Sequence, residues 1–123
     1  MGLKSYRELD AWKRAIDLVE AIYRLTRELP DGERFGLTSQ SQRAAVSIPA
    51  NIAEGYGRAN RKEYVHFLHI ARGSLMELET HLTLIGRLYS KHRDSAAECW
   101  TLTQEVGRLL GRLIRSLRPH PKP

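Results

Sequence analysis

Residues 35–58 read FGLTSQSQRAAVSIPANIAEGYGR, a helical pattern with a proline, Pro49, in its middle. Proline has no N–H to bond the carbonyl of Ala45, and its ring crowds that carbonyl, which costs roughly 3 kcal/mol in an ordinary helix. Contacts outside the helix must therefore offset this loss. The side chains around Pro49 are small or uncharged and polar, a composition that lets neighbours approach closely on several sides. We predict that this segment is the structural centre of an assembly.

Length and composition limit the class of protein. A chain of 123 residues, 41% hydrophobic and 28% charged, fits one ordinary globular domain. No apolar run is long enough to span a bilayer, and the first residues lack the apolar stretch of a signal peptide, so we expect a cytoplasmic protein without membrane contact. The single cysteine, Cys99, excludes an internal disulfide and fits a reducing compartment.

Apolar residues recur at spacings of three and four along the whole chain, which indicates helices and leaves no competing strand pattern. The pattern predicts helices at about 7–29, 37–57, 60–90 and 95–117. Short loops make consecutive helices antiparallel. The predicted fold is therefore all-α, an antiparallel up-down-up-down four-helix bundle that occupies residues 1–118.

Local signals mark the helix ends. Ser5 begins a capping-box pattern, Asn60 begins a second one, and Asp94 is a plausible N-cap for the last helix. Three prolines from Pro119 onward forbid further helix, so residues 119–123 are predicted to form a proline-rich tail.

The helix predicted at 37–57 has two apolar sides with a polar flank between them. Ile48 and Ile52 lie on one side, whereas Val46 and Pro49 fall on the opposite side of a helical wheel. A lone bundle needs one apolar stripe per helix, so the surplus predicts self-association, with the polar flank fixing register across the contact. The predicted oligomer interface comprises Gln40, Arg43, Val46, Ser47, Pro49, Ala50, Asn51 and Ala53.

Positive charge gathers in two groups of the chain, whose net charge is +6. A continuous cationic stripe is an electrostatic footprint for phosphate backbones, and the absence of interleaved aromatic residues favours sequence-independent contact. The alternatives are that the stripe complements its helix dipole, and that Arg58 pairs with Glu54 and Arg72 with Glu79. The predicted nucleic-acid contacts are Arg108, Arg112, Arg115 and Arg118 on the last helix, and Arg58, Arg61, Lys62 and Arg72 around the connection between the second and third predicted helices and on the third.

Residues 43–58 resemble the signature of a bacterial family of four-helix bundles, the 23S rRNA-intervening sequence proteins, and residues 9–13 and 63–79 extend the match. The resemblance covers about residues 5–115. It implies a homopentameric, barrel-like assembly, encoded in some bacteria within insertions of ribosomal RNA genes. The chain is more distantly similar to the accessory variability protein of diversity-generating retroelements, a basic pentamer that binds nucleic acid and partners a reverse transcriptase. For most members of the family the biochemical role is unassigned.

Candidate catalytic and metal-binding patterns are sparse. Glu63 and His66 match the Glu-x-x-His fragment of di-iron bundles, but a second such fragment is missing from the sequence, so no metal or cofactor is expected. Arg61 with His66, and Arg87 with His92, repeat the Arg-x4-His spacing of small helical ribonucleases. Chance alone yields about two such spacings in a chain this rich in arginine. We therefore expect no enzyme.

Two functions from different classes remain in view. The first is a non-enzymatic, homo-oligomeric and, from the resemblance, pentameric protein that binds RNA or DNA through basic outer surfaces, as an accessory factor to a partner such as a reverse transcriptase. The second is a structural or protein-interaction module whose charge is incidental. A small helical ribonuclease is a third and less favoured alternative.

Overall fold

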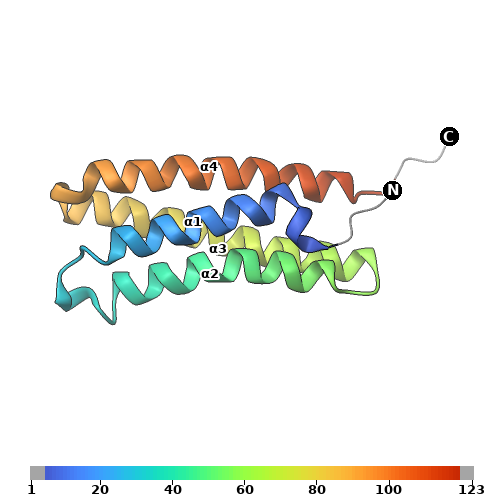
Figure 1. The fold of residues 1–123 in the computed structure, drawn as a ribbon, viewed down its shortest axis with the longest axis horizontal. Coiled ribbons are helices and arrows are strands. Elements are labelled where there is room, and N and C mark those ends of the chain that lie inside the picture. Colours follow the sequence, from blue (N-terminus) through green and yellow to red (C-terminus); the bar gives the residue numbers. More distant parts are fainter. Residues whose placement is uncertain (1–4, 120–123) are drawn as a thin grey trace.

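The computed structural model describes residues 5–119, which form a bundle of four α-helices with three short 3-10 turns. The helices are α1 (Asp10–Thr26), α2 (Leu37–Tyr56), α3 (Arg61–Leu88) and α4 (Arg93–Ser116). They lie side by side with their connections at alternate ends (Figure 1). Each helix contacts the next, and α4 closes against α1. The described residues contain no strand, so the predicted bundle is confirmed.

Residues 120–123 of the predicted proline-rich tail lie outside the described residues. Between residues 5 and 119, no helix is long and apolar enough to cross a membrane.

The predicted cap at Asn60 is confirmed at the start of α3. The Glu63 N–H donates to Asn60 Oδ1 at 2.9 Å, and Asn60 Nδ2 donates to the Glu63 carboxylate at 3.0 Å. The first of these bonds satisfies a backbone N–H at the helix start, and the second joins the two side chains, so only one half of the predicted capping box is formed.

Two other predicted caps were wrong. The Ser5 hydroxyl accepts the N–H of Arg7 at 3.1 Å and so caps the 3-10 turn Tyr6–Glu8, while α1 begins later, at Asp10. Asp94 lies inside the first turn of α4, which begins at Arg93 without a side-chain cap. The carboxylate of Asp94 can still interact favourably with the helix dipole there.

The core is aliphatic and receives side chains from all four helices. Burial of one such side chain stabilises the fold by about 1.5–3 kcal/mol relative to leaving it exposed. The most completely buried large aliphatic residues are Leu18 and Ile22 on α1, Ile48 and Ile52 on α2, Leu68, Leu78 and Ile85 on α3, and Val106 and Leu110 on α4.

Pro49 lies on the buried side of α2, next to fully buried Ile48. The sequence-based placement of Pro49 on the open side with Val46 was therefore wrong. The reason is that α2 contacts both α1 and α3, so its buried arc is wide enough to include Pro49 as well as Ile52. Burial of Pro49 within the chain thus offsets part of the free-energy cost of the backbone hydrogen bond that the proline removes.

The seam between α2 and α3 is the tightest in the bundle. A Cβ built on Gly55 would lie 2.8 Å from Phe67 Cβ and 3.0 Å from the carbonyl oxygen of Tyr64. Real Cβ atoms do not approach other atoms this closely, so the last turn of α2 requires glycine. Nearer the middle of the seam, Ser47 Oγ and Ser74 Oγ are 2.8 Å apart and form a hydrogen bond between the two helices.

A polar tie holds the far end of this seam. Glu33, in the 3-10 turn Asp31–Glu33 before α2, accepts the N–H of Leu37 at 3.2 Å and also a hydrogen bond from the Tyr89 hydroxyl at the end of α3. The bond from Tyr89 holds the pKa of the Glu33 carboxyl below its ordinary value, and the carboxylate in turn raises the pKa of Tyr89.

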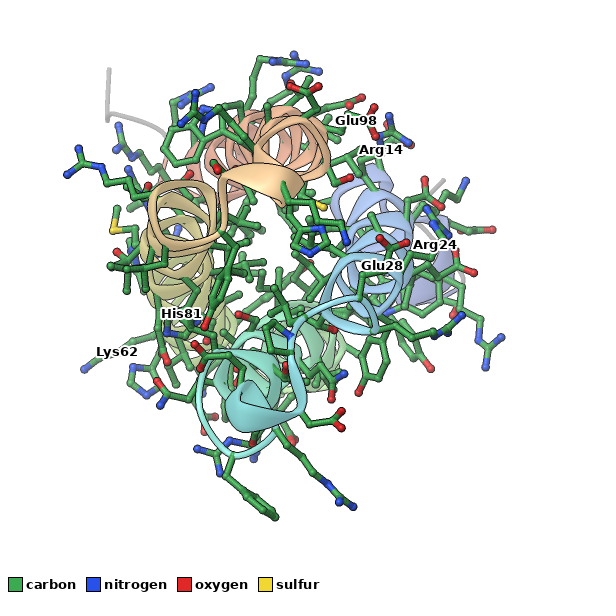
Figure 2. All side chains as sticks on the ribbon, turned by 90° about the vertical axis from the view of Figure 1, so that its left-hand side faces the viewer. Arg14, Arg24, Glu28, Lys62, His81 and Glu98 are labelled. Atoms are coloured by element: carbon green, nitrogen blue, oxygen red, sulfur yellow. The ribbon has the colours of Figure 1, made fainter. Side chains whose placement is uncertain are left out.

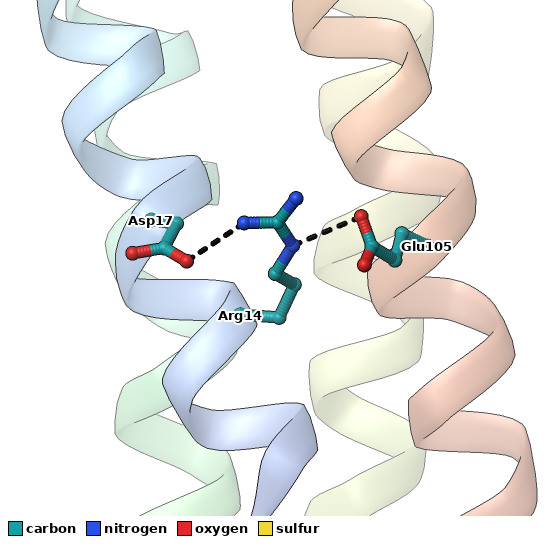
Figure 3. Close-up of polar contacts among 3 residues, drawn as sticks. All are labelled: Arg14, Asp17 and Glu105. Atoms are coloured by element: carbon teal, nitrogen blue, oxygen red, sulfur yellow. Dashed lines mark hydrogen bonds and ion pairs between the residues drawn. The ribbon is translucent and has the colours of Figure 1, made fainter.

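An ion cluster joins the first helix to the last (Figure 3). Arg14 donates from Nη1 to Asp17 on the same helix at 2.9 Å, and its Nε lies 2.9 Å from a carboxylate oxygen of Glu105 on α4. The hydrogen bond to Asp17, followed by the contact with Glu105, raises the pKa of the guanidinium. Because these side chains are about one-third to one-half exposed, solvent screens the cluster and its contribution to stability is small.

Substitution of Gly55 by alanine tests the tight seam. We expect Gly55→Ala to lower the free energy of unfolding by about 1–3 kcal/mol, because the new methyl group overpacks the contact with α3. Urea denaturation followed by circular dichroism measures the change. Gly73→Ala is the matched control: a Cβ at Gly73 meets nothing within 4 Å, so that substitution should stabilise α3 by up to about 1 kcal/mol. Equal effects at both positions would contradict the tight seam.

The Glu33–Tyr89 tie predicts a pH-dependent contribution to stability. Since the folded-state pKa of Glu33 is lowered, its contribution is present above the unfolded pKa, near 4.5, and is lost as the pH falls through the folded pKa. Tyr89→Phe removes the donor. We expect the difference in unfolding free energy between wild type and Tyr89→Phe to be largest near pH 7 and to shrink toward pH 3, as measured by urea titrations. A difference that does not change with pH would argue against the tie.

Candidate nucleic-acid interface

A groove of about 400 Å³ runs between the first half of α3 and the last turns of α4. The antiparallel arrangement creates it, because the start of α3 and the end of α4 lie at the same end of the bundle (Figure 1). We call it the basic groove. Its lining consists of Arg61, Lys62, Val65, His69 and Arg72 from α3, and Ile114, Leu117, Arg118 and Pro119 from the end of the chain.

The basic groove brings together cations from both groups that the sequence singled out. The group predicted around the connection between the second and third helices contributes Arg61, Lys62 and Arg72, and the predicted stripe on the last helix contributes Arg118. Among the described residues, no carboxylate is part of the lining. In residues 5–119, none of these four side chains has an ion pair or a hydrogen bond. Figure 2 shows Lys62 extending away from the bundle.

The length of the basic groove suits a nucleic-acid backbone. Arg61 and Arg72 are eleven positions apart on α3, which corresponds to about 16 Å along the helix. A strand of duplex DNA carries one phosphate per about 3.4 Å of its axis. The cations of α3 therefore extend over about five phosphates of one strand.

Arg58 behaves differently from the other residues in its predicted group. Its Nη2 forms an ion pair with Glu54 at 2.9 Å, and its guanidinium lies 4.6 Å from the centre of the Phe67 ring. The alternative that Arg58 pairs with Glu54 is confirmed. For Arg72 the corresponding pairing was wrong, because the carboxylate of Glu79 accepts a hydrogen bond from Gln104 instead.

The four arginines of the predicted stripe on α4 are exposed, but they do not face one surface. Arg118 lines the basic groove beside α3, whereas Arg112 lines a separate groove beside α1, together with Leu9 and Asp10. The prediction of one continuous stripe was therefore wrong. Arg118 follows Ser116, where α4 ends, so it does not continue the helical spacing of Arg108, Arg112 and Arg115.

The residues predicted for an oligomer interface fall into three classes of exposure. The structure exposes Gln40, Arg43, Val46 and Ala50, half-buries Ser47, Asn51 and Ala53, and buries Pro49. Next to them on α1, Tyr23 is 40% exposed, and it lines a shallow groove with Arg43 and Val46. Two apolar side chains, Tyr23 and Val46, thus remain exposed between α1 and α2 in a groove whose other lining residues are polar.

Part of the polar flank of α2 is satisfied inside the chain. Asn51 Nδ2 donates to the carbonyl oxygen of Ser47 at 2.8 Å and to its hydroxyl at 2.9 Å, and that hydroxyl bonds Ser74 on α3. Ser47 and Asn51 therefore fix the α2–α3 register within one subunit. Their predicted role between subunits stays a prediction.

The residues of the metal and ribonuclease alternatives are dispersed. The Glu63 carboxylate accepts a hydrogen bond from Asn60 Nδ2, and no group of three His, Cys, Asp or Glu side chains in residues 5–119 is placed to hold a metal ion. Arg61 lines the basic groove without His66. His92 is buried with Nδ1 3.9 Å from a carboxylate oxygen of Glu28, whereas Arg87 lines a groove between α3 and α4.

The structure shows features of the site that the sequence reasoning missed. Leu117, which is half-buried against the core, also lines the basic groove, and His69 joins its lining. A second groove contains Trp100, which follows the core residue Cys99 directly. The sequence could have indicated that Trp100 is exposed, because it lies one residue after Cys99 and therefore outside the apolar stripe that α4 buries.

The fold and this surface together define a class of protein: an all-helical antiparallel bundle with a basic groove along one pair of helices. The chain belongs to the 23S rRNA-intervening sequence protein family, whose model matches residues 7–112. It is also similar to a protein of unknown function of the S23 ribosomal protein family from Bacteroides thetaiotaomicron, whose crystal structure was determined at 1.70 Å. The two share 24% identity with a TM-score of 0.78, over 85% of this chain and 98% of the other. That likeness supports the fold. No curated protein sequence matches the chain.

Proposed function

We propose that the protein is a non-enzymatic, homo-oligomeric accessory factor that binds nucleic acid through the basic groove. The observation that carries this proposal is the meeting of four cations in one groove, Arg61, Lys62 and Arg72 from α3 and Arg118 just after α4, which within residues 5–119 have neither an ion-pair partner nor a carboxylate beside them in the lining. Guanidinium and ammonium groups of this kind bind phosphate oxygens and release the counterions around them. The contact requires no particular base sequence.

The proposal includes no catalytic step. An Arg-His pair that cleaves RNA must place both groups at one phosphate, since the arginine stabilises its charge while the histidine moves a proton. Arg61 and His66 do not share a groove lining, and His92 is buried beside Glu28, apart from the groove of Arg87. Labelled RNA incubated with the protein should therefore be recovered uncut.

Self-association would multiply the basic groove around a ring. Tyr23 and Val46 remain exposed between α1 and α2, on a different pair of helices from the basic groove. Copies that meet through α1 and α2 would leave the α3–α4 side accessible, and the fields of several grooves would add. The family resemblance implies five copies and a reverse transcriptase as a candidate protein partner.

The salt dependence of binding tests the nucleic-acid proposal. If four phosphates are neutralised per groove, the slope of log affinity against log salt concentration for duplex DNA is about −3.6. We expect Arg61→Gln combined with Arg72→Gln to weaken binding and to reduce the size of that slope by about 2. Fluorescence anisotropy of a labelled duplex, between about 50 and 200 mM salt, measures both quantities.

Arg58→Gln is the matched control for this experiment, because Arg58 is already paired with Glu54 and lies over the Phe67 ring. It should leave the slope unchanged while lowering stability by about 1 kcal/mol. Failure of the wild-type protein to bind duplex at low salt would overturn the nucleic-acid proposal and favour a structural or protein-interaction module.

The oligomer proposal has its own test. Light scattering should report a particle of about 70 kDa for five copies of the 14.1 kDa chain. Val46→Lys should reduce the mass, because it replaces one of the two exposed apolar side chains between α1 and α2 with a charged one. Met76→Lys, at a comparably exposed position on α3, is the control and should leave the mass unchanged. A 14.1 kDa wild-type particle would refute self-association, and dissociation only by Met76→Lys would place the contact elsewhere.

A further inference from the structure

Trp100 occupies an unusual position for a tryptophan. Its side chain is 41% exposed, on the outer side of α4, although large aromatic residues are mostly buried in folded chains. It lines a groove of about 340 Å³ between the end of α3 and the start of α4. The buried residues Leu82 and Ala96 contribute to the lining, so the indole stands beside an apolar floor.

The groove beside Trp100 is kept open by small residues. Gly86 faces it from α3, and a Cβ built there meets nothing within 4 Å. Glycine inside a helix is less favourable than alanine by about 1 kcal/mol, and no packing contact in the described chain requires it at this position. With Ala97 on the α4 side, the result is free space next to an indole.

Two guanidinium groups flank this space. Arg87 lies in the last turn of α3 and Arg93 begins α4, and both belong to the groove lining, which contains no carboxylate among the described residues. In residues 5–119, neither arginine has an ion pair or a hydrogen bond. Arginine forks recognise phosphate oxygens in a bidentate manner, and indole faces stack on nucleobases.

We propose that Trp100, Arg87 and Arg93 form a stacking site for an unpaired nucleobase of single-stranded nucleic acid, with the neighbouring phosphates held by the two guanidiniums. The site rests on the proposed function and refines it. Bases inside a duplex already stack on one another, so a free indole face favours a strand whose bases are unstacked. Charge complementarity selects this occupant over a second copy of the chain, which would have to neutralise both arginines.

The stacking site and the basic groove lie on the same side of the bundle. Both are built from α3 and α4, which occupy neighbouring corners when the bundle is viewed along its axis (Figure 2). His69 and Gly86, one in each lining, are seventeen positions apart on α3, or about 25 Å along the helix. One extended strand can therefore place its phosphates in the basic groove and a base on Trp100.

The experiment uses the full chain and two probes, a single strand of twelve deoxyadenosine nucleotides and a DNA duplex of the same length. Trp12→Phe leaves Trp100 as the sole tryptophan, and binding of the single strand should quench its fluorescence in a saturable way. By anisotropy in the otherwise wild-type chain, Trp100→Leu should weaken single-strand binding about tenfold, whereas Trp100→Phe, which keeps an aromatic face, should stay within about threefold. Neither substitution should change duplex binding.

The outcomes separate this inference from the proposed function. Equal single-strand affinities for wild type and Trp100→Leu, with duplex binding still sensitive to Arg61→Gln and Arg72→Gln, would overturn the stacking site alone. Failure of both probes to bind at low salt would overturn the proposed function and the stacking site with it. A smaller particle for Trp100→Leu in light scattering would show that Trp100 contacts another copy, which would also overturn the site. Because anisotropy needs no Trp12→Phe, misfolding of that variant leaves the test intact.

Discussion

The rest of the structure depends on the close approach of α2 and α3. At Gly55 there is no room for a side chain against Phe67, and the hydrogen bond between Ser47 and Ser74 sets the register of the two helices. Once that register is fixed, the rotation of α3 about its axis is also fixed, and with it the set of α3 residues that face α4. The position of Arg61 and Arg72 beside the end of α4, and of Gly86 beside Trp100, follows from it. Contacts between small residues along the α2–α3 seam thus help to determine where the charged surface lies.

The number of helices, their approximate limits and their order could be predicted from periodicity alone, because a spacing of three and four is a property of one helix at a time. The predictions that were wrong concerned features that depend on the packing of two elements against each other. Pro49 was placed on the open side since a wheel does not show that α2 is covered by both α1 and α3. Ser5 resembled a cap for α1, but the 3-10 turn Tyr6–Glu8 intervenes. The serines of the seam could not be paired before the register was known.

The basic residues show the same limit of prediction. Both cationic groups could be found in the sequence, but only the antiparallel packing of α3 on α4 shows that Arg118 belongs with Arg61 and Arg72, while Arg112 faces α1. The ion pairs were likewise ambiguous from sequence. Arg58 forms an ion pair with Glu54, four positions before it, whereas Glu79 accepts a hydrogen bond from Gln104 on another helix. Sequence spacing can identify which partners are possible within a helix. Choosing among them requires the neighbouring helix.

The contact of α1 with α4 has a consequence for the synthesis of the protein. The first helix packs against the last one, and Arg14 reaches across to Glu105 (Figure 3). While the chain is emerging from the ribosome, α1 must therefore wait for residues 93–116 before the side that faces α4 is covered. The bundle consequently closes only when α4 has been synthesised, and a nascent chain interrupted before α4 exposes apolar core residues to the chaperones around it.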